Sequence, residues 1–370
     1  MKIGILTYHF ANNYGAVLQA FALKKYLDNN GHSATIINYD SELKNSTNRR
    51  PINKIVSFGW DVFRYLFGYG RKKRGFNCFR KDYLNICEPV LKNLESFREY
   101  LCKNDYQCMI VGSDQVWNPY INGHDEAYFL NLPGFSGKRI AYAASFGIST
   151  IPEDYKKQIR DLLKTFNSIS VREETAKNIL NDFGICSTVT LDPVFLLNDE
   201  WEQLINLKPI FSQKYILCYS MPGDKLVTHK IKLQAKAISK KTGARIIYIG
   251  RKEYNYILPN GFDYNCKTPI EFLSLIKFAD CIVTNSFHGT AFSLIFKKAF
   301  YSVVNNKTKG NKQLSSRIVD LLTTLKLDNR IVKVSEQEEI KEDINYDYVE
   351  VSSLVDKSKK WIDDAIRDGQ

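Results

Sequence analysis

Residues 280–300 read DCIVTNSFHGTAFSLIFKKAF, and this stretch decides the fold that we expect for the whole chain. An apolar run at 281–284 is followed by a polar turn and then by a second apolar run at 291–296. This pattern predicts a buried strand, a turn and a buried helix. His288 and Gly289 would then stand at a helix N-terminus, where unpaired N–H groups and the helix dipole favour an anion.

Each polar residue of this turn has both a structural and a functional interpretation. Ser286 and Thr290 offer hydroxyl groups to a ligand, and either one could instead cap the helix. Gly289 allows a ligand to approach the backbone closely. His288 is the side chain of this stretch that can gain or lose a proton near neutral pH. The structural interpretation is a capped helix whose histidine is merely hydrogen-bonded.

The same alternation begins at the start of the chain. Apolar runs at 2–8 and 34–39 flank an amphipathic pattern, which predicts a βαβ unit and a parallel sheet. Ligands bind such sheets beyond the carboxyl ends of the strands. We therefore expect Asn12, Asn13 and Tyr14, in the loop after the first strand, to line a cleft. The loop lacks the GxGxxG spacing of a dinucleotide-binding fingerprint.

The length of 370 residues and the repeated alternation predict an α/β protein with two domains. We expect one Rossmann-like domain over 1–205 and another over 206–345, each with a parallel sheet. The two would form a GT-B-like arrangement with an inter-domain cleft. A helix in the segment 346–370 would pack back across both domains.

The composition is that of a globular protein, with 44% hydrophobic and 25% charged residues. The 8 cysteines lack zinc-site spacing, so we expect reduced thiols and no metal site. No apolar run approaches the roughly 18 residues that span a bilayer. The first residues do not resemble a signal peptide. We therefore expect a cytoplasmic protein.

Most of the net charge of +12 comes from residues 44–81. This segment contains eleven Lys or Arg residues and one acidic residue, Asp61, so it carries +10. It is either a solvated basic linker beside a packed helix, or a cationic surface for anionic lipid or an anionic acceptor. No recognised nucleic-acid module accompanies it, so we do not expect a nucleic-acid partner.

Two other predicted strands are followed by residues whose side chains could take part in catalysis or ligand binding. Asp114, in the sequence GSDQVWNP, is a candidate general base or hydroxyl-binding carboxylate, and Trp117 is a candidate platform for a sugar ring. The structural alternative is a turn cap and a core tryptophan. Arg172 follows the strand at 169–171, where a guanidinium suits a carboxylate or phosphate. Its alternative is an ion pair with Glu173, Glu174 or Asp192.

Six motifs, in this order, resemble the polysaccharide pyruvyl transferase family, in the branch of bacterial capsule and exopolysaccharide gene clusters. The motifs are YHFANNYGAVLQAFAL, VGSDQVWNP, YAASFG, SVREETAKNIL, LDPVFLL and TNSFHGTAFSLIFKKAF. The resemblance covers roughly residues 1–330 and implies a GT-B-like fold without a metal. It also implies transfer of the pyruvyl group of phosphoenolpyruvate, as a ketal, onto two sugar hydroxyls, with no further cofactor. The implied acceptor is a lipid-linked or nucleotide-linked glycan in the cytoplasm.

The implied chemistry gives roles to the residues singled out above. His288 would protonate the enol carbon of the donor, and Asp114 would accept or orient a sugar hydroxyl. Arg172 and the N–H groups of Gly289 and Thr290 would bind the donor's phosphate and carboxylate. The second domain would hold the donor and the first the acceptor.

The chain departs from the family pattern at Ser286, where other branches carry an arginine two residues before the histidine. We expect Arg317 to supply the missing cation. If the acceptor is linked to a polyprenyl diphosphate, the basic segment 44–81 would hold the enzyme at the inner face of the membrane.

Two other functions fit the same predicted architecture. One is a GT-B glycosyltransferase that uses a nucleotide sugar, which an inter-domain cleft and a basic segment would serve equally well. The other is a non-catalytic glycan-binding member of the fold, because function depends on the site and not on the fold.

Overall fold

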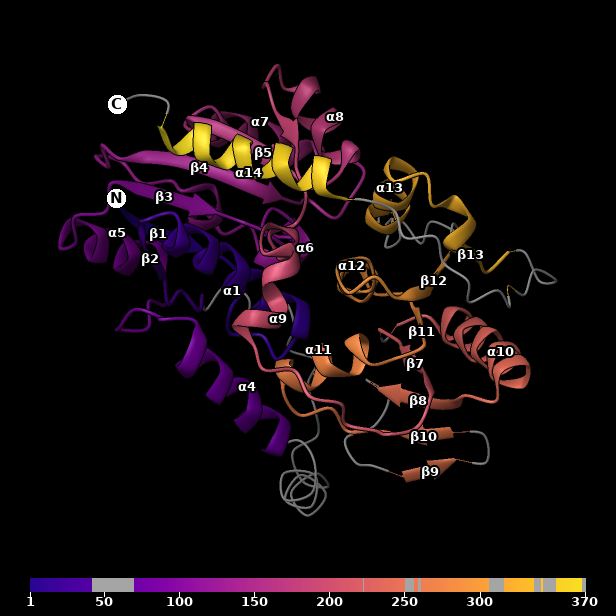
Figure 1. Ribbon diagram of the computed structural model, residues 1–370. Coiled ribbons are helices and arrows are strands. Elements are labelled where there is room, and N and C mark those ends of the chain that lie inside the picture. The colour runs from indigo at the N-terminus through magenta and orange to yellow at the C-terminus, as the bar shows by residue number, and fades with distance from the viewer. Residues whose placement is uncertain are drawn as a thin grey trace, which may run out of the picture.

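The computed structural model describes residues 1–41, 70–221, 223–249, 256–258, 261–305, 316–335, 341 and 351–367. Most of the basic segment 44–81 lies outside these ranges. Figure 1 shows two α/β halves, each built around one sheet. None of the helices in the described ranges has the length and apolarity that crossing a bilayer requires.

The first half is built on a six-stranded sheet with the order β2-β1-β3-β4-β5-β6, in which all neighbours are parallel. The strands are β1 (Lys2–Leu6), β2 (Ser33–Ile36), β3 (Cys108–Val111), β4 (Lys138–Ala144), β5 (Ser168–Val171) and β6 (Thr188–Val189). The helices are α1 (Tyr14–Asn29), α4 (Gly70–Tyr83), α5 (Leu94–Cys102), α6 (Pro119–Asn122), α7 (Glu153–Leu163) and α8 (Glu174–Asp182), with the 3₁₀ turn η2 (Glu126–Phe129). The winding reverses between β1 and β3, so the loops after these strands flank a switch point.

The second half is built on a seven-stranded sheet with the order β13-β12-β11-β7-β8-β10-β9. Its strands are β7 (Tyr215–Tyr219), β8 (Arg245–Ile249), β9 (Tyr256–Leu258), β10 (Gly261–Asp263), β11 (Cys281–Thr284), β12 (Ala299–Val304) and β13 (Ile331–Lys333). Its helices are α10 (Lys225–Thr242), α11 (Pro269–Lys277), α12 (Phe287–Ile295) and α13 (Ser316–Thr324), with the 3₁₀ turn η5 (Asp328–Arg330). All pairs are parallel except β9 with β10 at one edge. The switch point lies between β7 and β11, and His288 follows β11 in the sequence.

Side-chain caps determine where the helices around the switch points begin. Asn13 caps α1 by accepting a hydrogen bond from the N–H of Ala16. Ser286 caps α12 in the same way through Gly289, and Thr268 caps α11, whose first residue is Pro269. Such caps satisfy N–H groups that a helix cannot pair internally.

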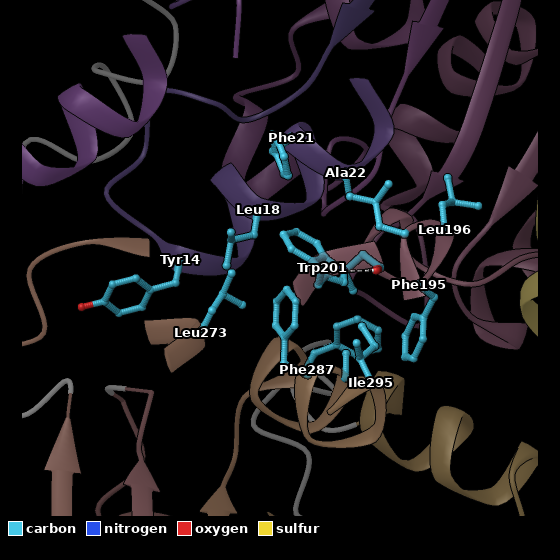
Figure 2. Packing of buried hydrophobic residues seen from close by; sticks show 14 of the residues in the cluster. Tyr14, Leu18, Phe21, Ala22, Phe195, Leu196, Trp201, Leu273, Phe287 and Ile295 are labelled. Atoms are coloured by element: carbon cyan, nitrogen blue, oxygen red, sulfur yellow. Dashed lines mark hydrogen bonds between the residues drawn. The ribbon is translucent and has the colours of Figure 1, made fainter. Parts of the chain in front are cut away.

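The two halves share one apolar core, in which α1 of the first half faces α11 and α12 of the second (Figure 2). Between the sheets the chain forms η3 (Pro193–Leu196), η4 (Asn198–Glu200) and α9 (Trp201–Leu204). Trp201 is fully buried and its ring lies 5.1 Å from that of Phe292, while Tyr14 stacks on Phe272 at 4.6 Å. Burial of each such side chain contributes about 1.5–3 kcal/mol, so the interface is a strongly stabilising contact.

The C-terminal helix α14 (Ser352–Arg367) returns to the first half, where it lies along the sheet (yellow in Figure 1). The Tyr26 hydroxyl donates to Asp363 at 3.0 Å, and the Leu191 N–H donates to the Ser358 hydroxyl at 3.0 Å. Lys138 also donates to the carbonyl of Ile366. These bonds fix the end of the chain to the domain in which it began.

Candidate functional site

A buried cluster of charged side chains joins the carboxyl edges of the two sheets. Arg172, just after β5, donates through Nη1 to Asp192 Oδ2 at 2.7 Å, and both side chains are 0% exposed. The same carboxylate oxygen stands 3.6 Å from His288 Nε2, at the start of α12. Asp114 Oδ1 lies 3.7 Å from Arg172 Nη2 and is the member of the cluster nearest to solvent. The site thus combines a guanidinium and two carboxylates of the first half with an imidazole of the second half.

Asp192 anchors this cluster. Burial alone would raise the pKa of its carboxyl, but His288 and Arg172 outweigh burial and hold that pKa well below its usual range. Asp192 also accepts hydrogen bonds from the Ser113 hydroxyl and the Val194 N–H, both at 3.1 Å. A carboxylate with so many donors is a poor base, so it suits holding Arg172 and His288 in place.

Arg172 does not use all of its hydrogen-bond donors within the described residues. Burial opposes its charge, but Asp192 and the other carboxylates overcome burial and raise the pKa of the guanidinium. Its Nε and Nη2 are buried and donate no hydrogen bond to any described residue. His288 Nε2 is likewise buried without a hydrogen bond to a described residue, and Glu173 Oε2 is buried and accepts none from them. Arg172 Nε lies 4.0 Å from Glu173 Oε2, and His288 Nε2 lies 3.6 Å from Asp192 Oδ2, so these atoms face one another at distances longer than a hydrogen bond.

Arg317, on α13, adds a second guanidinium to the neighbourhood. Burial and the charge of Arg172 lower the pKa of Arg317 to about 10. The carboxylates of the cluster act in the opposite direction, so Arg317 experiences the same group of charges. The charges of Arg172 and Arg317 are near enough to interact, and two neighbouring guanidinium groups favour an anion. Whether Arg317 replaces the arginine expected at Ser286 remains a prediction.

The loop after β3 places Asp114 at the first switch point. Gly112 has a φ of +116°, and a Cβ atom there would lie 2.2 Å from the carbonyl oxygen of Tyr142. Only glycine fits such a position without displacing the backbone. Asp114 then accepts from the Gln115 N–H at 2.9 Å, so its carboxylate is oriented by its own loop. Its role as a base remains a prediction.

Two predicted ligand-binding aromatics are core residues, and those predictions are wrong. Trp117 is 0% exposed, and its indole N–H donates to the Tyr128 carbonyl at 2.9 Å, so it cannot stack on a sugar ring. Tyr14 is 3% exposed, and its hydroxyl donates to the Cys266 carbonyl at 2.6 Å. Tyr14 therefore joins the two halves and does not line a cleft.

The helix N-terminus at Gly289 and Thr290 is also not available as expected. Ser286 accepts from the Gly289 N–H at 3.3 Å through its hydroxyl and from the Thr290 N–H at 3.0 Å through its carbonyl. Thr290 is fully buried, with its hydroxyl 2.7 Å from that of Ser302. The cap Ser286 thus satisfies the two N–H groups that we expected to bind an anion.

The loop before α1 contains Asn12 and Asn13, which serve different purposes. Asn13 caps α1, whereas the Asn12 side chain accepts from Arg80 of α4 at 2.8 Å. Arg80 has no counterpart among the residues singled out from the sequence, because bonds from an arginine to backbone carbonyls leave no sequence pattern. The sequence offers Asp192 as one of three partners for Arg172, and its position before Pro193 marks a turn.

The described part of the chain contains no cluster of His, Cys, Asp or Glu side chains suited to a metal ion. All eight cysteines are free thiols.

Comparison with solved structures identifies the architecture. The Listeria monocytogenes protein described as a UDP-N-acetylglucosamine 2-epimerase has a TM-score of 0.50 and 9% identity, over 100% of this chain and 97% of that one. The UDP-GlcNAc 2-epimerase of Methanocaldococcus jannaschii has a TM-score of 0.49 and 13% identity, over 100% and 94% of the two chains. The likeness to the Listeria protein concerns the fold alone, and it confirms the predicted GT-B-like α/β architecture with two domains.

No curated protein sequence matches the chain. The family model "Polysaccharide pyruvyl transferase" matches residues 13–307, which include Asp114, Arg172, Asp192 and His288. The match covers well over half of the sequence, and the chain belongs to the polysaccharide pyruvyl transferase family.

Proposed function

We propose that this protein transfers the pyruvyl group of phosphoenolpyruvate, as a ketal, onto two hydroxyls of a sugar in a surface-polysaccharide precursor. The observation that carries the proposal is the Arg172–Asp192–His288 cluster, in which Arg172 Nε, Arg172 Nη2 and His288 Nε2 make no hydrogen bond to the residues that the structure describes. A donor that carries both a carboxylate and a phosphate needs this kind of surface. Arg317 supplies a further cation on the side of the second domain.

In the proposed reaction, His288 gives a proton to the methylene carbon of the enol, which leaves an oxocarbenium-like centre at C2. One sugar hydroxyl attacks this centre and loses its proton to Asp114. The second hydroxyl then displaces phosphate to close the ketal. One hydroxyl proton is thereby balanced by the new methyl group and the other leaves with phosphate, so neither an oxidant nor water is consumed.

Asp192 supports this reaction by holding the imidazole and the guanidinium together. Its low pKa keeps a negative charge 3.6 Å from His288 Nε2, which orients the imidazole. Asp114 reaches solvent where an acceptor would enter, with a side chain 19% exposed against 0% for Arg172. Asp114 of the first domain would therefore lie on the glycan side, and His288 and Arg317 of the second domain on the donor side.

The test is calorimetric titration with phosphoenolpyruvate, using UDP as the contrasting ligand. We expect binding of phosphoenolpyruvate that weakens at least tenfold in Arg317→Ala and His288→Ala and is unchanged in Arg367→Ala, an exposed arginine. Thermal unfolding shows which variants are folded. Binding of UDP with no phosphoenolpyruvate signal would overturn the proposal and favour a nucleotide-sugar glycosyltransferase.

We further propose that the enzyme acts in the cytoplasm at the inner face of the membrane, on a lipid-linked acceptor. The described part of the basic segment is α4, whose Arg71, Lys73 and Arg74 are exposed. Each such residue contributes on the order of 1 kcal/mol to binding of anionic lipid. Changing all three to Gln should weaken binding to phosphatidylglycerol vesicles about 100-fold. The matched control changes the exposed Lys157, Lys164 and Arg160, and equal losses in both variants would contradict a specific role for α4.

A further inference from the structure

Gln19 of α1 is fully buried, and each polar atom of its side chain has a partner. Its Nε2 donates to the Thr7 hydroxyl at 2.8 Å and to the carbonyl of Ala16 at 2.9 Å, while its Oε1 accepts from the Ser113 N–H at 3.1 Å. The reversed amide would set its NH₂ group against the Ser113 N–H and its oxygen against the Ala16 carbonyl. Gln19 is therefore held in a single orientation.

Thr7, which follows β1, closes these bonds into a ring. Its hydroxyl accepts from Gln19 and donates to the carbonyl of Ser113 at 3.2 Å. Both backbone polar groups of Ser113 are thus bound to fully buried side chains. Such bonds are costly to break, because a buried group that loses its partner does not regain one from water. The ring therefore fixes the backbone of Ser113 relative to α1 and β1.

The Ser113 hydroxyl connects this ring to the charged cluster. It lies 3.1 Å from Asp192 Oδ2 and 2.9 Å from the carbonyl of Ala143. The pKa of Asp192 lies well below its usual range, so its carboxylate is charged, attracts the hydroxyl proton more strongly than a neutral carbonyl and has no proton of its own to donate. The hydroxyl is therefore directed at Asp192 Oδ2, which also binds Arg172 and faces His288.

Helix α1 thereby limits the positions of both Asp192 and His288. Gln19 lies four residues after Gly15, about one helical turn, so the two share one face of the helix. Gly15 packs against the imidazole of His288. Gln19 holds Ser113, whose hydroxyl is bound to Asp192. One face of α1 thus restrains the imidazole directly and the carboxylate through a single intermediate.

Ser113 also directly precedes Asp114, the proposed base. The carbonyl of Asp114 accepts from the Ser145 N–H at 3.1 Å, which ties the next part of the loop to the end of β4. A displacement of Ser113 therefore moves Asp114 as well as Asp192. The base and the carboxylate that faces the acid thus depend on the position of one buried residue.

We propose that Gln19 and Ser113 are positioning residues for the reaction. Gln19 fixes the backbone of Ser113. Ser113 in turn sets where the carboxylates of Asp192 and Asp114 stand relative to the imidazole. The proposal rests on the proposed function, because that function assigns the acid and the base. An error of about 1 Å in such an arrangement can cost on the order of 100-fold in rate.

The chain offers a matched control in Gln234, a second fully buried glutamine. It lies on α10, and its amide exchanges hydrogen bonds with the backbone of Lys341. Gln19→Met and Gln234→Met each keep the length of the side chain and remove a buried amide. We expect both variants to melt below the wild type, because a buried partner loses its hydrogen bond in each case. Ser113→Ala is a smaller change and provides the test if Gln19→Met does not fold.

The position of His288 can be observed without a substrate. The chain has 5 histidines, so ¹⁵N-labelled histidine gives few ring signals, and His288→Ala identifies the signals of His288. We expect Gln19→Met and Ser113→Ala to shift these signals and Gln234→Met to leave them unchanged. Signals of His288 that neither Gln19→Met nor Ser113→Ala shifts would overturn the proposal.

Turnover provides the second measurement. Phosphate release would be followed with phosphoenolpyruvate and the methyl glycosides of glucose, galactose and mannose, beside calorimetric binding of phosphoenolpyruvate. We expect kcat to fall about 100-fold in Gln19→Met and Ser113→Ala, and the Kd to change by less than about threefold. The Kd is retained because Arg172 keeps its 2.7 Å bond to Asp192. Gln234→Met should retain both values, and equal losses of kcat in Gln19→Met and Gln234→Met would reduce Gln19 to a structural role.

A double variant shows whether the two residues act along one path. Because Gln19 acts through Ser113, adding Gln19→Met to Ser113→Ala should reduce kcat little further. Losses that multiply would show that Gln19 acts by another route, which would contradict the proposal.

The two measurements separate this proposal from the proposed function. If the wild type neither binds nor converts phosphoenolpyruvate, while the signals of His288 respond to Gln19→Met and not to Gln234→Met, the donor is wrong and the positioning of the imidazole stands. If phosphoenolpyruvate is converted and both Gln19→Met and Ser113→Ala keep the wild-type kcat, the reaction stands and the positioning role is wrong.

Discussion

Gly15 of α1 packs directly against the imidazole ring of His288 of α12. A Cβ atom on Gly15 would stand 2.0 Å from Nδ1 and 2.4 Å from Cγ of that ring. Real Cβ atoms do not approach other atoms so closely, so one of the two helices or the ring would have to move. Two helix N-termini, one from each sheet, thus meet at the proposed acid catalyst.

Gly15→Ala should therefore impair turnover more than folding. The added methyl group displaces the imidazole from Asp192, and a misplacement of about 1 Å can cost on the order of 100-fold in rate. Overpacking should lower the free energy of unfolding by about 1–3 kcal/mol. The measurements are the rate of phosphate release and urea unfolding. In an exposed helix the same substitution would be stabilising, so a more stable and fully active variant would contradict the contact.

A double-mutant cycle isolates this contact. In a His288→Ala background the ring is absent, so Gly15→Ala should no longer reduce stability. An equal loss of stability in both backgrounds would show that the methyl group meets something other than the ring.

Asp192→Asn should destabilise the protein by about 3–5 kcal/mol, because it leaves the buried Arg172 without its 2.7 Å partner. The loss should depend on pH. The lowered pKa of Asp192 means that its carboxylate stabilises the fold above the unfolded pKa, about 3.9, and ceases to do so as pH falls through the lower folded pKa. Urea unfolding at pH 6, 4 and 3 should show the difference between the two proteins shrinking. The exposed Asp182, changed to Asn, is the control.

Asp320→Asn should have the opposite pH dependence. Burial, Glu173 and Glu174 raise the pKa of Asp320 to about 6. The neutral carboxyl is therefore the form that the fold favours, and stability falls as pH rises through this value. We expect the variant to melt above the wild type at pH 7.5 and close to it at pH 4.5. A variant less stable than the wild type at pH 7.5 would contradict the raised pKa.

Arg317→Ala should separate binding from stability. The two arginines repel each other, and Arg172 contributes to the lowered pKa of Arg317. Removing Arg317 should leave the melting temperature unchanged or higher while phosphoenolpyruvate affinity falls at least tenfold. Such an exchange of stability for function is expected where like charges are held together at a site. Loss of stability with unchanged affinity would show that Arg317 is structural.

The sequence was a good guide where local patterns determine structure. His288 stands at a helix N-terminus after a buried strand, as predicted, because strand, turn and helix are encoded within about twenty residues. Arg172 at the end of β5 followed from the same reasoning. Arg172 has three possible carboxylate partners in the sequence. The choice among them depends on how η3 packs against the sheet, and the local sequence pattern does not predict that packing.

The errors have a common physical origin in contacts between distant segments. Trp117 reads as an exposed aromatic in a polar motif, but η2 folds over it and supplies the Tyr128 carbonyl to its indole. Tyr14 reads as a loop residue, but the second half covers it through Phe272 and Cys266. The hydrogen bonds from Arg80 to the loop before α1 likewise require α4 to pack against a segment that lies some seventy residues earlier in the sequence.

The apolar cluster that Trp201, Phe292 and α1 build belongs to neither sheet alone. A chain cut between β6 and β7 would leave each fragment with an incomplete core and a large exposed apolar surface. Neither fragment should be soluble by itself. The two fragments should regain a native interior only when they are refolded together, so Arg172 of one half and His288 of the other are brought together by a single cooperative folding transition.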